Sequence, residues 1–468
     1  MSIDLNSHAV DVAVVGGGIA GLAAAYELWR RGVSFVILER SDRAGGVIIS
    51  EQVDGYTIDG GPDALLVQKP DAIALCGELG LGDRLVSTKP PRLAYIQRGG
   101  RLHALPAGSV LGIPSRIGPF LGTRLFTWAG KLRMGAELFV PAKRDDVDES
   151  IGAFITRRFG AEATTYLAEP LLAGIHAGDV DRLSMHALFP RFVEDERQYG
   201  SLLRAVRRRA HTPSPDGAFR SLPGGLSEMV EALTRALPTG VMRLRTPVAR
   251  ISANGDGFRV DTLGASGPVQ SRAVIVAAPA YAIASMLRDY DGEIASLCGG
   301  IPYASAGTVV LAFRREDVRH PLNGSGFVVP RVEANGILAA SWLSSKWPRR
   351  APDDRVLLRA FVGGARDPEA LEQTDAQLVA RAIAALTPLL GVRGQPLFSR
   401  VYRFVRANAQ HEVGHLARIA AIERALARRP GLFLTGSGLR SIGIPDCVGD
   451  GRATAHQVTE WLKSSERS

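Results

Sequence analysis

The glycines near the start of this chain are spaced for close approach of the backbone to a ligand. Gly16, Gly18 and Gly21 form a GxGxxG pattern directly after the apolar run 11–15. In this pattern the first glycine permits a tight turn, the second lets the backbone approach a pyrophosphate, and the third lets a helix pack closely. The helix that follows offers free N–H groups and its positive dipole end to phosphates. We therefore predict a dinucleotide site, the alternative being a merely structural glycine turn.

An acidic residue and a second glycine pair narrow the choice of dinucleotide. Glu39 follows the apolar run 35–38 and is placed to accept hydrogen bonds from a ribose hydroxyl, which favours FAD or NAD over NADP. The next segment, with Arg43, Gly45 and Gly46, resembles the RxGG segment of the monoamine-oxidase-like flavoproteins. In that family the arginine and its glycines lie along the FAD diphosphate. The alternative is an ordinary loop with a solvated arginine, but behind the first glycines and Glu39 the resemblance favours FAD.

The elements that must position these residues recur at distant places along the chain. We expect a helix over 19–31 and buried parallel strands at 273–278 and 431–436. Two short strands, 248–251 and 258–262, flank a turn rich in Asn and Gly. The fold class predicted is α/β, with a Rossmann-like FAD-binding domain built from discontinuous segments, a mixed α+β substrate domain and a mostly helical insertion.

The domain boundaries follow from where these elements fall. Residues 1–82, 215–282 and 425–468 are assigned to the FAD-binding domain, 83–214 to the helical insertion, and 283–424 to the substrate-binding domain. A chain of 468 residues, with 46% hydrophobic residues, is long enough for such an arrangement and for a large buried ligand.

The charge and the cysteine content limit which partners and which cellular compartment we expect for the protein. The net charge of +9 fits a solubilising surface, an anionic substrate or an anionic lipid surface, and no nucleic-acid-binding motif is present, so we expect no nucleic acid partner. The three cysteines have no CxxC spacing, which fits a reducing compartment and argues against a structural zinc site. With no signal-peptide pattern and no apolar run long enough to span a bilayer, we expect a cytoplasmic protein.

One stretch, 106–141, is basic, amphipathic and rich in aromatic residues. It mixes large apolar side chains, among them Leu111, Trp128 and Phe139, with arginines and lysines. Such a composition suits a peripheral position on the inner face of a membrane, and the alternative is a helical wall packed on the rest of the protein. The sequence leaves this choice open, and equally whether the chain forms a homodimer.

Several segments resemble those of the bacterial porphyrinogen oxidases, a group within the monoamine-oxidase-like flavoproteins. In chain order they are 60–63 (GGPD), 170–179 (PLLAGIHAGD) with Leu183, Ser184, Phe189 and Pro190 after it, 221–226 (SLPGGL), 413–415 (VGH) and 443–447 (GIPDC). The resemblance covers nearly the whole chain. It implies an oxidase with non-covalent FAD that converts coproporphyrinogen III or protoporphyrinogen IX into a porphyrin in haem biosynthesis.

Four positions depart from the family pattern. His176 stands where a tyrosine is usual, and Phe404 where we expect a tryptophan. Ala409 and His411 replace the proline and tyrosine of the usual PQY segment. These departures affect the C-terminal side of the cofactor site and bear on substrate detail more than on FAD binding.

The resemblance also implies a set of FAD contacts. The first glycines and Arg43 would hold the diphosphate, Glu39 the ribose, and the backbone of Val248 the adenine edge. Residues 442–444 would lie against the flavin pyrimidine edge. Independently, Pro445 suits the first turn of a helix, whose dipole would stabilise negative charge at flavin N1 and O2. The complete predicted set is Gly16, Gly17, Gly18, Ile19, Ala20, Gly21, Glu39, Arg40, Arg43, Gly45, Gly46, Val47, Gly61, Pro62, Asp63, Ala64, Val248, Phe404, Ile442, Gly443 and Ile444.

The implied reaction is hydride transfer from a porphyrinogen carbon to flavin N5, with O2 as the acceptor and H2O2 as a product. No side chain is assigned as an essential acid or base, because the cofactor supplies the chemistry. Lys69 and Arg92 are candidate partners of the propionate carboxylates, the alternative being solvated cations. His176 either lines the substrate site or is a core histidine. The basic charge and Lys69 favour coproporphyrinogen III, which carries more carboxylates than protoporphyrinogen IX.

Three rival functions share parts of these patterns. An amine oxidase or carotenoid-type desaturase would share the N-terminal segments. A non-catalytic protein of the GDP-dissociation-inhibitor type tends to lose the phosphate-binding glycines, which this chain keeps. An FAD enzyme that passes electrons to a membrane quinone would suit the basic amphipathic stretch.

Overall fold

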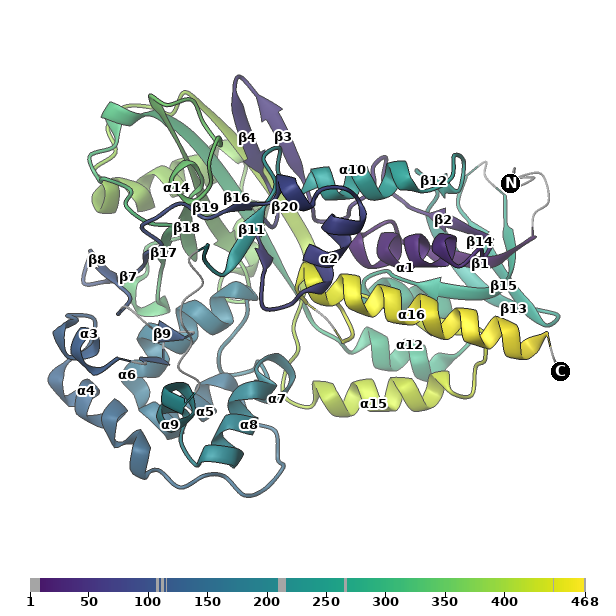
Figure 1. Cartoon of the computed structure of the whole chain (residues 1–468), viewed down its shortest axis with the longest axis horizontal. Helices are drawn as coiled ribbons and strands as arrows, with labels where there is room; N and C mark the ends of the chain where they lie inside the picture. Colours follow the sequence, from purple (N-terminus) through teal and green to yellow (C-terminus); the bar gives the residue numbers. More distant parts are fainter. Residues whose placement is uncertain are drawn as a thin grey trace.

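The fold brings together two large sheets and a helical region. The computed structural model describes residues 9–106, 109–110, 113–114, 116–208, 216–264, 267–440 and 442–466. One seven-stranded sheet lies to the right in Figure 1, a second lies at the upper left, and most of the short helices gather at the lower left. The C-terminal end of α16 lies at the right-hand end of the view.

The first sheet has a parallel centre. Its order is β12-β2-β1-β15-β14-β13, and β21 also pairs with β15. The strands are β1 (Ala9–Val15), β2 (Phe35–Leu38), β12 (Met242–Arg243), β13 (Val248–Asn254), β14 (Gly257–Thr262), β15 (Val269–Val276) and β21 (Leu432–Leu434). β1 pairs in parallel with β2 and β15, and β15 with β21, so the expected buried parallel strands from distant segments are confirmed.

Alternate residues of the central strands point to opposite faces of this sheet, and helices cover both faces because both sets of residues are apolar. Val12 and Val14 pack in one core with helices α1 (Ile19–Arg30), α2 (Asp71–Glu78), α10 (Ser227–Ala236) and α16 (Ile444–Ser465). Ala13 and Val15 pack in another with α11 (Ala280–Leu287), α12 (Gly292–Gly299) and α15 (His415–Leu426). The result is the three-layer α/β arrangement that the sequence predicts.

The second sheet is mixed and has the order β20-β16-β19-β18-β17-β7-β8. Its strands are β7 (Ala94–Arg98), β8 (Arg101–Ala104), β16 (Tyr303–Arg314), β17 (Gly326–Val328), β18 (Ala339–Trp342), β19 (Arg355–Gly363) and β20 (Phe398–Ala409). Helix α14 (Asp375–Leu390) packs against it with a shared core. The hairpin β7–β8 comes from the segment expected to be mostly helical, yet β7 pairs in parallel with β17 and extends this sheet.

The helical region forms around a core of its own. It comprises α3 (Ile117–Gly122), α4 (Trp128–Gly135), η2 (Ala136–Phe139), α5 (Ile151–Phe159), α6 (Ala161–Ala163), the π-helix η3 (Thr164–Ala173), α7 (Met185–Leu188), α8 (Pro190–Tyr199) and α9 (Leu202–Arg208). Its core includes Phe126, Phe154 and Leu172. Within the described part of the chain, no helix is long and apolar enough to cross a membrane.

Short sheets connect these larger parts. β5 (Leu65–Leu66), β11 (Phe219–Ser221) and β6 (Val86–Ser87) form a three-stranded sheet, and β3 (Ser50–Val53) pairs with β4 (Tyr56–Asp59). β11 lies between β5 and β6, so this small sheet holds together the two ends of the 67–85 segment, which contains α2.

Candidate flavin and substrate site

The turn between β1 and α1 requires glycine at two of its positions. Gly16 has φ +108°, and a Cβ added there would lie 2.5 Å from the Ala277 carbonyl oxygen. A Cβ at Gly21 would lie 2.0 Å from the Gly16 carbonyl oxygen. A Cβ at Gly18 would meet no described atom within 4 Å, although Gly18 is the N-cap of α1. The protein thus leaves open space at the helix N-terminus where a pyrophosphate would approach the backbone.

Glu39 joins this turn to the end of β2. Its carboxylate accepts hydrogen bonds from the backbone N–H of Gly17 at 2.6 Å and of Ser41 at 2.8 Å. The backbone carbonyl of Glu39 accepts from Thr246 N at 2.8 Å, which brings the start of β13 and therefore Val248 beside it. Each carboxylate oxygen has a second acceptor site, so these contacts leave acceptor capacity for a ribose hydroxyl.

Arg43 folds the loop that carries the second glycine pair. Its guanidinium donates to the carbonyl oxygens of Ala44 and Ile48, each at 3.0 Å, and to that of Gly46. The N–H of Gly45 donates to the Gly17 carbonyl at 2.8 Å, which fastens the loop to the phosphate turn. Sequence reasoning missed this internal role of Arg43, which shapes the loop through backbone oxygens.

The 60–63 turn meets two other predicted flavin contacts. A Cβ on Gly61 would lie 2.0 Å from the Val47 carbonyl oxygen and 3.5 Å from Cζ of Phe404. Gly60 packs as closely against the ring of Tyr402, its added Cβ lying 2.6 Å from that ring. The structure therefore brings Val47, Gly61 and Phe404 together from three distant parts of the chain.

The carboxylate of Asp63 holds the 60–63 turn in place through three hydrogen-bonded partners. Its carboxylate accepts from Lys346 Nζ at 2.7 Å, Trp347 Nε1 at 2.7 Å and the Arg359 guanidinium at 2.8 Å. Burial raises the pKa of the Asp63 carboxyl, but Lys346 and Arg359 outweigh burial and hold that pKa well below its ordinary range. Arg359 also donates to the carbonyls of Asp59 and Gly61, both at 2.7 Å.

These partners of Asp63 were missed from the sequence. Arg359 is 2% exposed and stands inside the apolar strand β19. A lone arginine in such a run is a signal for a buried ion pair, because a buried charge must be paired. Its partner, however, lies 296 residues away along the chain, so no local pattern identifies it.

The N-terminus of α16 reaches the same region. Gly443 is its N-cap and Pro445 lies in its first turn, as the sequence predicts. Further along, a Cβ on Gly451 would lie 2.3 Å from the Ala20 carbonyl oxygen, so α16 crosses α1 at contact distance near the N-terminus of α1. The N-cap of α16 is eight residues from this crossing, about 12 Å along the helix, so the two helix N-termini favour negative charge at two separate points of one elongated cofactor.

Two of the predicted substrate residues lie beside this helix end. Lys69 Nζ forms an ion pair with Asp446 Oδ2 at 2.6 Å. Burial, together with the nearby Lys69 ammonium, lowers the pKa of His176 to about 4, so His176 is neutral near pH 7. Its Nδ1 is out of solvent and has no hydrogen-bond partner among the described residues.

Arg92 lies at the same end of the small sheet as Lys69. Val67 N donates to the Ala218 carbonyl at 2.9 Å, and a Cβ on Gly217 would lie 2.7 Å from Arg92 Nε. The Arg92 Nε donates to the carbonyl and hydroxyl oxygens of Thr88. The segments that carry both predicted cations thus meet the 217–218 turn before β11, although Arg92 is engaged with its own loop.

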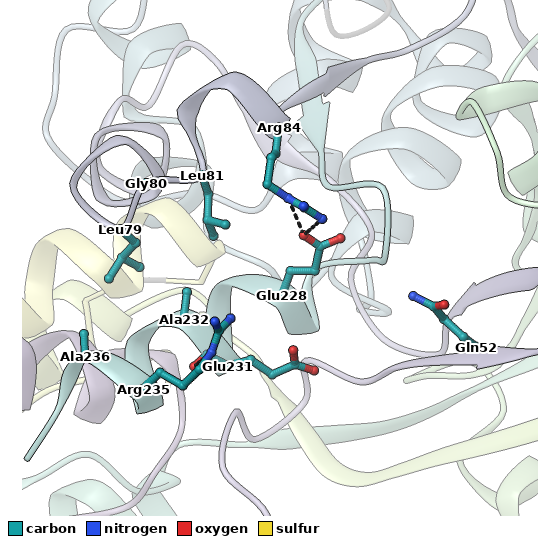
Figure 2. Close-up of a pocket in the computed structure, with 10 residues that line it drawn as sticks. All are labelled: Gln52, Leu79, Gly80, Leu81, Arg84, Glu228, Glu231, Ala232, Arg235 and Ala236. Carbon is teal, nitrogen blue, oxygen red and sulfur yellow. Dashed lines mark hydrogen bonds and ion pairs between the residues drawn. The ribbon is translucent and has the colours of Figure 1, made fainter. Parts of the chain in front are cut away.

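A separate groove lies between the end of α2 and α10 (Figure 2). It has a volume of about 620 Å³ and is lined by Gln52, Leu79, Gly80, Leu81, Arg84, Glu228, Glu231, Ala232, Arg235 and Ala236. Arg84 and Glu228 form an ion pair across it at 2.6 Å. None of these lining residues was predicted as a site residue, and two arginines face two glutamates. The groove therefore offers no net charge for a charged ligand, and we assign it no function.

FAD fits the residues that converge around the phosphate turn. The open space at Gly18 accepts a pyrophosphate, the Glu39 carboxylate is oriented at the neighbouring turn, and two helix N-termini face the region. The loop shaped by Arg43 and the turn held by Asp63 contact each other where Gly61 packs against the Val47 carbonyl. These features suit a long anionic dinucleotide.

Comparison with known proteins agrees with this reading. The model of the family described as flavin-containing amine oxidoreductases matches residues 19–459. A coproporphyrinogen III oxidase of Bacillus subtilis is 34% identical over 97% of this chain and 98% of its own length. One from Staphylococcus aureus is 33% identical over 96% and 99%. The mitochondrial protoporphyrinogen oxidase of Nicotiana tabacum is 28% identical over 98% and 97%.

Solved structures share the fold over nearly the whole chain. A protein from Exiguobacterium sp. 255-15, provisionally described as a protoporphyrinogen oxidase, superposes with a TM-score of 0.87 at 32% identity and covers 97% of this chain and 99% of its own. Cyclohexylamine oxidase of Brevibacterium oxydans gives a TM-score of 0.69 at 16% identity, covering 97% and 99%, and shows likeness of fold alone.

Proposed function

This chain belongs to the family of flavin-containing amine oxidoreductases and is an FAD-dependent oxidoreductase, and on that premise we propose that it oxidises coproporphyrinogen III to coproporphyrin III. The observation that carries the proposal is full-length similarity, at 31–34% identity, to bacterial coproporphyrinogen III oxidases. The tobacco protoporphyrinogen oxidases are 28% identical, so protoporphyrinogen IX is the second candidate substrate.

The roles of the segments follow from this proposal. Residues 1–82, 215–282 and 425–468 form the FAD-binding domain, which is supported by the pairing of β1, β2, β15 and β21 in one sheet. Residues 283–424 supply the substrate-binding domain, apart from α12 and α15, which pack on the first sheet. In our proposal the hairpin β7–β8 also serves this domain, because it extends the same sheet.

The protein's own contribution is to hold the cofactor and orient the substrate. The chemistry that bound FAD supplies is acceptance of a hydride from a substrate carbon, with the electrons then passed to oxygen. The 16–21 turn and the loop folded by Arg43 hold the diphosphate, and Glu39 holds the ribose. The N-terminus of α16 stabilises negative charge on the pyrimidine edge.

Substrate orientation depends on charge at one end of an apolar site. Lys69 attracts a propionate carboxylate as a point charge, and Arg92 offers a planar guanidinium for a second one. His176, being neutral, contributes surface without adding charge to the site. No side chain is required to act as an acid or a base on the substrate.

Steady-state kinetics test the choice of substrate. The purified FAD-loaded protein is given coproporphyrinogen III or protoporphyrinogen IX in air, and porphyrin fluorescence and H2O2 are followed. We expect a higher kcat/KM for coproporphyrinogen III, with H2O2 formed in proportion to the porphyrin. A higher kcat/KM for protoporphyrinogen IX would make this the enzyme of that substrate instead.

We also propose that the helical region touches a lipid surface. Its described apolar side chains Ile117, Leu121, Trp128, Leu132 and Phe139 are between 45% and 84% exposed. Others from the 106–141 stretch, including Phe120, Leu125 and Phe126, are core residues, and Leu111 lies outside the described residues. Exposed apolar side chains that recur within one short basic stretch are typical of an interfacial contact.

Sedimentation with vesicles tests the lipid contact. We expect the protein to sediment with vesicles of anionic phospholipid, and the variant W128S/L132S/F139S to remain in the supernatant. If the protein stays in the supernatant with every vesicle composition, the exposed side chains serve another purpose. A cytoplasmic location remains a prediction from the sequence.

A further inference from the structure

The ion pair between Lys69 and Asp446 joins two parts of the chain that both border the substrate region. Lys69 follows β5, and Asp446 lies in the first turn of α16, with 2.6 Å between Nζ and Oδ2. The two side chains remain 49% and 30% exposed. An ion pair in contact with water is weak, because solvent screens the attraction and both side chains lose freedom. A competing carboxylate can therefore replace Asp446 on Lys69.

Asp446 is held in place by its own helix as well as by Lys69. A Cβ added at Gly443, the N-cap of α16, would lie 3.3 Å from Asp446 Oδ2. The carboxylate thus folds back over the helix N-terminus, where the macrodipole favours a negative charge. Asp446 can release Lys69 and still keep a favourable position.

The other groups around Lys69 do not offset this competition. His176 is neutral near pH 7, since burial and the Lys69 ammonium keep its pKa near 4. Asp71, at the start of α2, packs against Gly449 one turn further along α16 and adds a second acid on this face of the helix. Among the described residues, Asp446 is the acid that forms an ion pair with Lys69.

We propose that Asp446 is a specificity-determining residue: it is an internal carboxylate that occupies Lys69 until a carboxylate of the substrate replaces it. This inference rests on the proposed function. To bind Lys69, a carboxylate of the porphyrin or porphyrinogen must displace the carboxylate of Asp446. A ligand whose carboxylate cannot displace Asp446 therefore binds poorly. No covalent bond changes in this exchange, and Lys69 keeps one carboxylate partner throughout.

Binding of the product measures this competition without turnover. FAD-loaded wild type and D446N are titrated with coproporphyrin III, and quenching of protein fluorescence gives the Kd. We expect D446N to bind about two- to fivefold more tightly at low ionic strength, because the competing charge is gone. The gain shrinks at high salt, where the Debye length is about 3 Å.

A double-mutant cycle shows whether the effect passes through Lys69. K69M is expected to bind coproporphyrin III more weakly than wild type, and K69M/D446N is expected to match K69M. D446S, which keeps an oxygen suited to the first turn of a helix, serves as the second variant should D446N hold FAD poorly. E460Q breaks the exposed Lys463–Glu460 pair, of 3.1 Å, on the same helix and should leave the Kd unchanged.

The outcomes separate this inference from the proposed function. If wild type oxidises coproporphyrinogen III but D446N and D446S bind coproporphyrin III no more tightly, Asp446 is not a competitor and the inference is overturned. If wild type neither binds nor oxidises the porphyrin pair, the proposed function fails first. In turnover, we expect a lower KM for coproporphyrinogen III in D446N than in wild type.

Discussion

Gly18 is a position where we expect an added side chain to disturb cofactor binding without disturbing the fold. An added Cβ there meets no described atom, whereas one at Gly21 would lie 2.0 Å from the Gly16 carbonyl oxygen. We predict that G18A folds with an unchanged thermal midpoint as apoprotein, yet binds FAD about 10- to 100-fold more weakly, because the methyl group occupies the space of the pyrophosphate. Flavin absorbance after reconstitution measures this affinity.

G21A is the matched comparison for G18A. Its methyl group strikes backbone within the protein, so it should lower the stability of the apoprotein by about 1–3 kcal/mol. If G18A lowered apoprotein stability as much as G21A, the open space at Gly18 would not be a cofactor site.

Asp63 is the residue on which the flavin-side turn depends. Removing its charge with D63N leaves Lys346 and Arg359 without their buried partner, which we expect to cost about 3–5 kcal/mol at pH 7. The pKa of Asp63 is lower in the folded protein than in the unfolded chain, so its contribution is present above the unfolded value of about 3.9 and is lost as pH falls below it.

Thermal unfolding across pH tests this sign. The difference in stability between wild type and D63N should be constant from about pH 7 to 5 and narrow below about pH 4. D354N, which breaks the exposed Arg355–Asp354 pair, is the control and should change little. A difference that widens as the solution is acidified would contradict the account of Asp63.

Among the secondary-structure elements, those with local patterns were predictable and those held by distant partners were not. The strands expected at 35–38, 258–262 and 273–278 and the helix beginning at Ile19 follow from apolar periodicity and glycine turns. All are present, although β15 begins at Val269 and ends at Val276. The hairpin β7–β8 lies in the segment expected to be mostly helical, and its place in the second sheet depends on pairing with β17, more than 200 residues later.

The candidate site divides in the same way. Glycine spacing and Glu39 identify the phosphate turn, because a backbone conformation leaves a local mark in the sequence. The pairs Asp63–Arg359 and Lys69–Asp446 join residues 296 and 377 positions apart, so tertiary folding alone brings them together. The individual flavin contacts remain predictions.

Two buried histidines, His411 just before α15 and His415 at its start, contact the segment before α16. The rings of His411 and His415 stack at 3.8 Å, and they contact the carbonyls of Ser437 and Leu439. Burial, with His415 and His176 nearby, lowers the pKa of His411 to about 3. The neutral form is thus favoured in the folded protein, and stability present above about pH 6.5 is lost as pH falls toward 3.

We predict that acidification weakens the contacts between these histidines and the segment before α16, and thereby releases FAD. Between about pH 6.5 and 5 the thermal midpoint of wild type should fall and free FAD fluorescence should rise. H411Y, which introduces the residue usual in the family and does not titrate in this range, should show a shallower fall in the midpoint. Equal pH dependence in wild type and H411Y would exclude His411 as the responsible group.

Over the whole molecule, three parts of different character meet at one place. The two large sheets and the helical region adjoin one another in Figure 1. The first sheet with α1 and α16 supplies the phosphate turn and two helix N-termini, the second sheet supplies Arg359 and Phe404, and the π-helix of the helical region leads to His176. A π-helix at such a junction is common near functional sites. The reaction therefore depends on all three parts being assembled.

Anaerobic reduction of the flavin tests the central claim most directly. Coproporphyrinogen III is added to the yellow, FAD-loaded protein without oxygen, and the visible flavin band is followed before air is admitted. The account predicts rapid bleaching of the flavin, then return of its colour together with porphyrin fluorescence once oxygen enters. A flavin that stays oxidised with both coproporphyrinogen III and protoporphyrinogen IX, yet is bleached by an amine, would contradict it.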